Sequence, residues 1–444
     1  MNKQVNLTNG KILNVLIAFT LPILFANLFQ QLYNTIDTMI VGYYLGDNAL
    51  AAMGSTASLF ELLVGFATGV GSGFSVVIAR YVGANDEANL KKAIAASICL
   101  GAILTLIIMS LSLFALKPLM HLLNTPSSIF EQAYSYLFVV CICVGITLTY
   151  NMASGILRAK GNSIIPLIAL FISSILNIGL DILFIVKFKS GVQGAAIATV
   201  ISQAISAALC LIYIKFKEKI LVPNRHSFTI DKFLYKDLIG QGLSMGLMLS
   251  IVATGTVILQ TAINKCGTEV IAGYIGARKV MSLFTLPMSA LATALTTYVS
   301  QNYGAQNIQR IKDGVRQSNI MIIIWSIISI AIIFLTSDIL VKLILSTSND
   351  QIIYYGSTYL KISAIFFPSL CVLLNLRCSL QGLGQKIVPL FSSIIEMVGK
   401  LAFVVLLIPS LGFIGICITE PLIWVMMLMQ LLWSYYHNEI FKKS

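Results

Sequence analysis

Apolar residues in this chain occur in long continuous runs separated by short polar segments. Each run reaches the roughly 20 residues that an α-helix needs to cross a bilayer. A membrane barrel would show short alternating segments instead, so helices are favoured. The pattern predicts an all-α polytopic membrane protein with twelve transmembrane helices, near 12–44, 49–81, 92–116, 130–155, 163–187, 193–215, 236–264, 270–301, 317–336, 352–382, 387–409 and 412–436.

The longest stretch between these helices separates the first six from the last six. It spans residues 216–235 and is rich in lysine. Nothing else along the chain resembles a soluble domain. We therefore expect an N-terminal six-helix lobe at 1–215, a cytoplasmic linker at 216–235 and a C-terminal six-helix lobe at 236–444.

The two halves repeat one sequence pattern. The segment 79–91 resembles the segment 300–312, 221 positions later, and both contain a Gly-Ala turn. Internal duplication of a membrane bundle is typical of secondary transporters, in which the substrate site lies between the repeats and rocking of one against the other alternates access. Further pairs are Gly46 with Gly267 and Gly191 with Gly412, at an offset of 221, and Tyr136 with Tyr359, Gly161 with Gly384 and Pro166 with Pro389, at an offset of 223.

Composition agrees with a membrane location. Charged residues make up 10% of the chain, against about 25% in soluble proteins. Hydrophobic residues make up 57% and the mean hydropathy is +0.90. The eight cysteines form no CxxC pair and mostly fall within apolar runs, so we expect neither disulfides nor a metal site.

The net charge of +12 is explained by its placement rather than by a nucleic-acid partner. Nineteen basic residues, including Lys3, Lys442 and Lys443, fall on one side of the predicted bundle, and five fall on the other. The richer side is cytoplasmic by the positive-inside rule. We therefore expect a multi-pass protein of the cell membrane with both ends of the chain in the cytoplasm.

Five acids fall inside predicted spans, namely Asp37, Glu61, Asp181, Glu396 and Glu420. An aspartate at the centre of a membrane helix is disfavoured by about 2.5–3.5 kcal/mol on insertion scales. Such residues face the bundle interior or a water-filled cavity, and they often handle ions or protons. The alternative interpretation is a structural polar pair that holds two helices together.

Four polar residues of the first half are predicted to lie at one depth in the membrane. Asp37 lies two to three turns below the outer surface and Asp181 about two turns below it, and Asn177 shares a helix face with Asp181 through i, i+4 spacing. Thr199 reaches a similar depth on the next helix. Hard oxygen ligands of this kind suit a proton or Na⁺ rather than a transition metal.

The second half does not repeat these acids. At the offset of 221, Asp37 aligns with Ile258 and Asp181 aligns with Ala402. We therefore expect cation coupling in the N-terminal half. The acids of the second half pair differently, Glu420 with Thr199 at an offset of 221 and Glu396 with Ser173 at an offset of 223.

Pro22 lies inside the first predicted helix, four turns before Asp37. A proline there removes a backbone hydrogen bond and clashes with the preceding turn, so it favours a bend. The bend is either a functional hinge or a static kink.

The opening of the chain resembles the multidrug and toxic compound extrusion (MATE) family. The matching residues are Leu21-Pro22-Ile23-Leu24, the segment from Asn34 to Gly46 that contains Asp37, and the segment from Ala49 to Gly54. The Gly-Ala turns, the segment 191–196 and the six-plus-six helix pattern also fit, so the resemblance covers nearly the whole chain.

The resemblance implies a monomeric antiporter without a cofactor, whose two lobes form a V-shaped central cavity. Inward flow of H⁺ or Na⁺ would drive export of organic cations and other amphipathic drugs. In some relatives, acids on helices 7 and 10 bind Na⁺, but neither helix has such an acid here. The cation site of the family's N-terminal lobe carries over onto Asp37, Asn177, Asp181 and Thr199, with Gln30 and Tyr33 in the same polar network.

The substrate cavity is expected between the halves, lined by aromatic, methionine and small polar side chains. Methionine adapts to varied ligands, although in a membrane helix it is more often ordinary packing. Glu396 and Glu420 are candidate counter-charges for a cationic substrate. The candidate lining residues are Tyr150, Asn151, Met281, Phe284, Met288, Glu396 and Glu420.

Two other functions remain open at this point. An exporter or flippase of a lipid-linked or oligosaccharide substrate would share the architecture and use cations to bind phosphates. The candidate cations are Arg278, Lys279, Lys361, Arg377 and Lys400, all within predicted helices. A membrane enzyme is the second alternative, but no HExxH motif or nucleotide-binding loop occurs, and we expect a protein that is not an enzyme.

Overall fold

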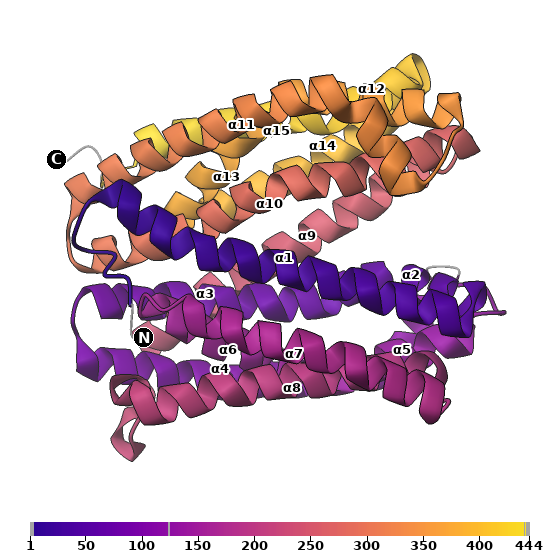
Figure 1. Cartoon of the computed structure of the whole chain (residues 1–444). Helices are drawn as coiled ribbons and strands as arrows, with labels where there is room; N and C mark the ends of the chain where they lie inside the picture. Colours follow the sequence, from indigo (N-terminus) through magenta and orange to yellow (C-terminus); the bar gives the residue numbers. More distant parts are fainter. Residues whose placement is uncertain (1–3, 123–124, 439, 441–444) are drawn as a thin grey trace. The chain divides into compact units, whose positions relative to one another are not determined.

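The computed structural model describes residues 4–122, 125–438 and 440, and within them it contains helices and no strand (Figure 1). Ten helices in these ranges are long and apolar enough to cross a membrane, or twelve if each of two bent helix pairs is one span. The predicted fold class is confirmed. Lys3, Lys442 and Lys443, which entered the charge count, lie outside the described residues.

The first half of the chain supplies helices that run alongside one another in Figure 1. The π-helical turns η1 and η2 interrupt two of its spans. The elements are α1 (Ile12–Leu45), α2 (Asp47–Phe60), η1 (Glu61–Gly65), α3 (Phe66–Gly83), α4 (Glu87–Leu122), α5 (Phe130–Ile142), α6 (Val144–Ala159), α7 (Ile164–Ile182), η2 (Leu183–Lys187) and α8 (Gly191–Lys217).

The second half repeats this order after two short 3₁₀ turns, η3 (Lys219–Leu221) and η4 (Arg225–Ser227). Helices α14 and α15 pack side by side, as their counterparts α7 and α8 do. The elements are α9 (Lys232–Ile263), α10 (Thr268–Gly304), α11 (Ile308–Leu345), α12 (Asp350–Ile365), α13 (Phe367–Gly382), α14 (Ile387–Leu411) and α15 (Phe413–Tyr436).

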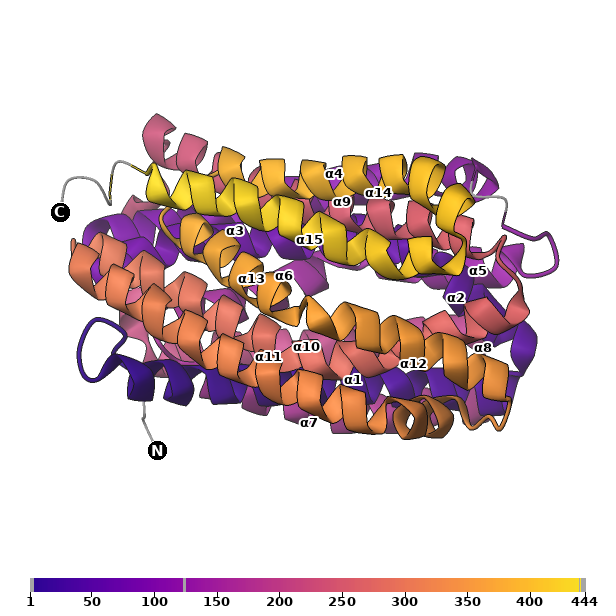
Figure 2. The ribbon, with the colours of Figure 1, turned by 90° about the horizontal axis from the view of Figure 1, so that it is seen from above.

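Two spans that were predicted as single helices are bent, and that part of the prediction is wrong. The chain turns by 49° at Cys143, between α5 and α6, and by 56° at Phe366, between α12 and α13. Figure 2 shows the second bend, where α12 meets α13. These two residues are 223 positions apart and have nearly the same backbone, with φ of −96° and −95°. Pro368 explains the second break, but no proline accompanies the first.

The backbone confirms the internal duplication. Positive φ angles occur at three paired glycines, with values of 80° and 101° at Gly46 and Gly267, and of 59° and 57° at Gly191 and Gly412. Only glycine adopts this region without strain, so the pairs mark equivalent turns. The third pair is Gly161 and Gly384, at 91° and 82°.

The chain forms two compact units. Unit 1 contains residues 4–8 and Ala18–Ser250, and unit 2 contains Asn9–Ile17 and the described residues from Ile251 onward. The first helix of each repeat is therefore divided, α1 after Ile17 and α9 after Ser250. The expected linker, 216–235, lies within unit 1.

The N-terminal half of α9 packs closely on α3 within unit 1. A Cβ atom on Gly69 would lie 2.6 Å from the carbonyl oxygen of Met245, and one on Gly73 would lie 2.6 Å from that of Gln241. The facing helix carries Gly242 and Gly246 at the same four-residue spacing. Paired glycines of this kind let two membrane helices approach backbone to backbone.

The outward faces of several helices are apolar and exposed. Phe114 of α4 is 81% exposed and Leu335 of α11 is 82% exposed. Water would not favour such a surface, whereas lipid tails would cover it. Polar side chains are buried between the helices, and the candidate site lies among them.

Candidate functional site

Unit 1 contains a polar cavity of about 280 Å³. Its lining comes from helices α1, α3, α6, α7 and α8, with η1 and one residue each of α2 and α9. The polar lining residues are Gln30, Tyr33, Asn34, Glu61, Thr68, Thr147, Tyr150, Asn151, Ser173, Ser174, Asn177, Thr199, Ser202, Gln203 and Ser206.

Two carboxylates lie beside this cavity, and each shares a helix face with a lining residue. Asp37 follows Tyr33 by four residues on α1, and Asp181 follows Asn177 by four residues on α7. The two carboxyl groups lie within electrostatic range of each other. Asp37 is 6% exposed and Asp181 is fully buried at 0%.

Two contacts join α1 to α7 and to the residue before it. The rings of Phe29 and Phe171 meet edge to face with centroids 5.0 Å apart. The Ser163 hydroxyl donates to the carbonyl oxygen of Phe19 at 3.1 Å. These contacts bring the i, i+4 pairs of the two helices to one place.

The buried polar atoms at this place lack hydrogen-bond partners within the described chain. They include Oδ1 of Asp37, both carboxylate oxygens of Asp181, both amide atoms of Asn177 and Oγ1 of Thr199. A buried polar group without a partner is destabilising by about 1–3 kcal/mol, and native proteins rarely retain several together. The cluster can therefore receive a proton or a cation, which would satisfy these atoms.

The electrostatics of the pair point to the same chemistry. Two like charges close together in a low-dielectric interior repel strongly, and a proton or a bound cation relieves that repulsion. The ligands are oxygen atoms, and the neighbouring amide can donate or accept. Asp37 and Asp181 can thus alternate between a protonated or cation-bound form and a charged form.

Glu61, one of the five acids predicted inside a span, is exposed on the cavity wall in η1. Sequence reasoning missed other residues of this centre. Gln203 accepts a hydrogen bond from Thr147, and Tyr136 lies within electrostatic range of Asp37. The i, i+4 spacing of Gln203 from Thr199 was the available signal for Gln203.

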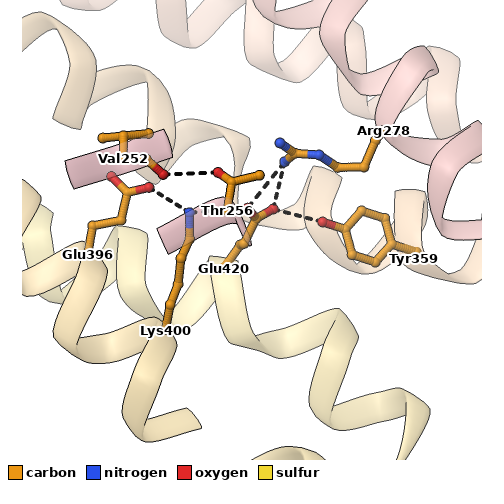
Figure 3. Close-up of polar contacts among 7 residues, drawn as sticks. All are labelled: Val252, Thr256, Arg278, Tyr359, Glu396, Lys400 and Glu420. Atoms are coloured by element: carbon orange, nitrogen blue, oxygen red, sulfur yellow. Dashed lines mark hydrogen bonds and ion pairs between the residues drawn. The ribbon is translucent and has the colours of Figure 1, made fainter. Parts of the chain in front are cut away.

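Unit 2 has a second polar centre, formed by four charged side chains (Figure 3). The Arg278 guanidinium on α10 donates to the two carboxylate oxygens of Glu420 on α15, at 3.2 and 2.9 Å. The Tyr359 hydroxyl on α12 donates to the same carboxylate at 2.8 Å. Glu420 is thus satisfied by two neighbouring helices.

On the other side of Glu420 lies a pair from α14 (Figure 3). The Lys400 ammonium is 2.8 Å from Glu396, four residues earlier, and 3.9 Å from Glu420. The side chain of Lys400 is 3% exposed and that of Glu396 is 14% exposed. Gly255 on α9 makes room for this lysine, because a Cβ there would lie 3.0 Å from Lys400 Cδ.

The two centres occupy equivalent places in the repeat. Helices α7 and α14 begin 223 positions apart, and the turns before α8 and α15 are 221 positions apart. Each member of the unit 2 centre except Arg278 therefore has a polar counterpart in unit 1. The pairs are Tyr359 with Tyr136, Glu396 with Ser173, Lys400 with Asn177 and Glu420 with Thr199.

The residues that were predicted to line a substrate cavity between the halves belong to both units. Tyr150 and Asn151 line the unit 1 cavity. Met281 and Met288 are 6% and 0% exposed in the apolar core of unit 2, and Phe284 packs against that core.

A duplicated bundle of membrane-length helices with buried polar centres defines a polytopic transporter fold. The MatE family model matches the chain twice, at residues 22–183 and 245–406, which lie 223 positions apart. The chain belongs to the MatE family of multidrug and toxic compound extrusion transporters. The resemblance inferred from its opening residues is confirmed.

Similar proteins agree with this assignment. The probable multidrug resistance protein YpnP of Bacillus subtilis is 27% identical over 397 residues, which cover 89% of this chain and 88% of YpnP. The probable multidrug resistance protein NorM of Thermotoga maritima is 27% identical, with coverage of 90% and 87%.

Solved structures show the same fold. A crystal structure of MATE in the bent conformation superposes with a TM-score of 0.91 at 24% identity, covering 100% of this chain and 99% of the other. An outward-facing multidrug resistance MATE family transporter of the MOP superfamily gives a TM-score of 0.91 at 24% identity, with both chains covered completely.

Proposed function

We propose that this protein is a secondary active multidrug exporter. Inward movement of H⁺ or Na⁺ drives the export of amphipathic, often cationic, drugs by alternating access. The names of similar proteins, among them a probable multidrug resistance protein and a multidrug export protein, support the substrate class. The protein acts as a monomer in the cell membrane, with its lysine-rich loops in the cytoplasm.

The observation that carries ion coupling is the buried cluster of unit 1. Asp37, Asn177, Asp181 and Thr199 bring together polar atoms that lack partners within the described residues. Gln30 and Tyr33 line the adjoining cavity and connect the cluster to it. Loading this cluster changes its charge, and that change biases the packing of α1 against α7.

The alternative export of a lipid-linked phosphate is disfavoured by the charges of unit 2. Arg278 and Lys400 form ion pairs with Glu420 and Glu396. Lys361 lies 3.6 Å from Asp338. Three of the five cations within the helices therefore already face a carboxylate, which weakens any attraction for phosphate.

The proposed function is tested by efflux from vesicles that contain the purified protein. Ethidium is loaded, and a pH gradient or a Na⁺ gradient is imposed separately, with protein-free vesicles as the control. We expect one gradient to drive ethidium export against its concentration gradient. Failure of both gradients to do so would contradict cation-coupled export.

A further inference from the structure

The unit 2 centre contains a second cation, Lys400, although Arg278 already balances the charge of Glu420. Glu420 already receives Arg278 and Tyr359 at hydrogen-bonding distance, whereas Lys400 is 3.9 Å away. Lys400 instead contacts Glu396 at 2.8 Å. The ammonium group therefore lies between two carboxylates, which is where a free monovalent cation would be held.

The repeat shows what Lys400 replaces. Its counterpart in unit 1 is Asn177, whose two amide atoms lack partners within the described chain. The serine counterpart of Glu396 is Ser173, and the counterpart of Glu420 is Thr199. At this position unit 1 thus has the amide of Asn177, and its acids occupy positions that are not equivalent to Glu396 and Glu420. Unit 2 has the ammonium group of Lys400, which lies between its two acids.

We propose that unit 2 contains a second monovalent-cation site, which the Lys400 ammonium fills as a tethered cation. The counterpart site in unit 1 exchanges its cation, and this comparison rests on the proposed function. The unit 2 site stays occupied because its cation is covalently part of α14. Removing the ammonium would convert unit 2 into a site for free Na⁺ or a small alkylammonium ion.

The geometry explains why the site would remain open after such a change. Gly255 leaves space along the lysine stem, so shortening residue 400 produces room beside two carboxylates. Glu396 is the less buried acid, with 14% of its side chain exposed against 5% for Glu420. A small cation would therefore be held chiefly by Glu396, with Glu420 as the second ligand.

The first test uses Lys400→Ala in the Asp37→Asn background, which disables the unit 1 cluster. The unfolding temperature of purified protein is measured with n-butylammonium chloride, the counterpart of the lysine tip, against N-methylglucamine chloride at equal ionic strength. We expect n-butylammonium to raise the unfolding temperature of this variant in a saturable manner and to leave the Asp37→Asn parent unchanged.

Two variants of the site and one control outside it define where n-butylammonium binds. Lys400→Met retains the stem without the charge, so n-butylammonium should find no space and give no saturable shift. Glu396→Gln combined with Lys400→Ala removes the main acid and should also abolish the shift. Lys361→Ala removes a cation from an exposed ion pair and should show no n-butylammonium dependence.

A second variant keeps the proposal testable if Lys400→Ala does not fold. Lys400→Asn reproduces the amide of Asn177 between the two acids, and Na⁺ should then raise its unfolding temperature more than N-methylglucamine does. The proposal is overturned if folded Lys400→Ala or folded Lys400→Asn shows no cation-specific shift, or if the parent shows the same shift. Ethidium export by the unaltered protein is a separate readout, so its failure would contradict only the proposed function.

Discussion

At the residue scale, the two polar centres differ in how far their groups are satisfied. In unit 1, buried atoms of Asp37, Asn177 and Asp181 lack partners within the described ranges, as the proposed exchange of a cation would require. In unit 2, the Glu420 carboxylate accepts hydrogen bonds from Arg278 and Tyr359 and lies 3.9 Å from Lys400. Its charge is therefore already balanced within the chain. The difference between unpartnered polar atoms in unit 1 and a partnered carboxylate in unit 2 therefore follows from individual side chains.

Asp37→Asn should abolish gradient-driven ethidium export while the protein still folds. An amide keeps the size of the carboxyl group, but it can neither exchange a proton nor balance a cation. The measurement is export from vesicles containing equal amounts of protein. Asp47→Asn is the control, because Asp47 is an exposed acid ten residues later. Normal export by folded Asp37→Asn would rule out the coupling role.

Glu420→Ala should destabilise unit 2 by about 3–5 kcal/mol, because it leaves the cations of Arg278 and buried Lys400 with one acid. Since the Arg278 side chain is 34% exposed, solvent screening should place the effect near the lower end. Denaturant unfolding in detergent measures it. Asp338→Ala should have an effect of only about 0–1 kcal/mol, because that pair is exposed. Equal effects would show that burial does not matter here.

At the scale of elements, close helix contacts and bends position the site. The crossing of α3 and α9 depends on glycines that admit no side chain. The bends at Cys143 and Phe366 separate each of two spans into segments that pack in different directions. The bends recur in equivalent helices of the two repeats, and the crossing depends on glycines from two helices. Both are therefore properties of whole helices rather than of single side chains.

Gly73→Ala should destabilise the protein by about 1–3 kcal/mol, because the added methyl group would overlap the Gln241 carbonyl at 2.6 Å and force the backbones apart. Gly54→Ala is the matched control, since a Cβ there meets nothing within 4 Å. Thermal unfolding in detergent should place Gly73→Ala below the parent and Gly54→Ala at or above it. The reverse order would contradict the tight crossing.

Pro22→Ala should slow turnover more than it weakens drug binding. Helix α1 runs without interruption from Ile12 to Leu45, and the boundary between the units falls five residues before Pro22. Alanine restores the missing backbone hydrogen bond and stiffens this segment. Ethidium affinity by fluorescence polarisation is compared with the export rate. An unchanged rate would make Pro22 a static kink.

At the scale of the whole molecule, the duplication explains both the similarity and the difference of the two units. Paired turns at Gly46 and Gly267 preserve the backbone, and the family model matches both copies. Lysine at position 400 and asparagine at position 177 preserve a polar side chain but not its charge. One scaffold thus carries two polar centres of different charge.

The orientation of the chain predicts which loops an impermeant thiol reagent reaches. His226→Cys lies in the lysine-rich segment between the repeats and should react only after cells are opened, whereas Ser348→Cys should react in intact cells. Both positions are exposed. The unsubstituted chain measures labelling of its own eight cysteines. Labelling of His226→Cys in intact cells would reverse the topology.

The sequence by itself determined the class of protein and the positions of its helices. Continuous apolar runs must form helices in a bilayer, because no water is present to satisfy free backbone groups. The helix predicted at 12–44 is therefore found at Ile12–Leu45, and the one at 412–436 at Phe413–Tyr436. The grouping of Asn177 with Asp181 was also predictable, because i, i+4 spacing is local.

Only the tertiary structure decided which helix faces meet. Lipid tails and a helix-bundle core are both apolar, so periodicity does not show which side of a membrane helix turns inward. The pairing of Arg278 with Glu420, 142 positions apart, therefore had no sequence signal. Neither did the bend at Cys143 or the division of α9 after Ser250. These features arise from contacts between distant segments, which local spacing does not encode.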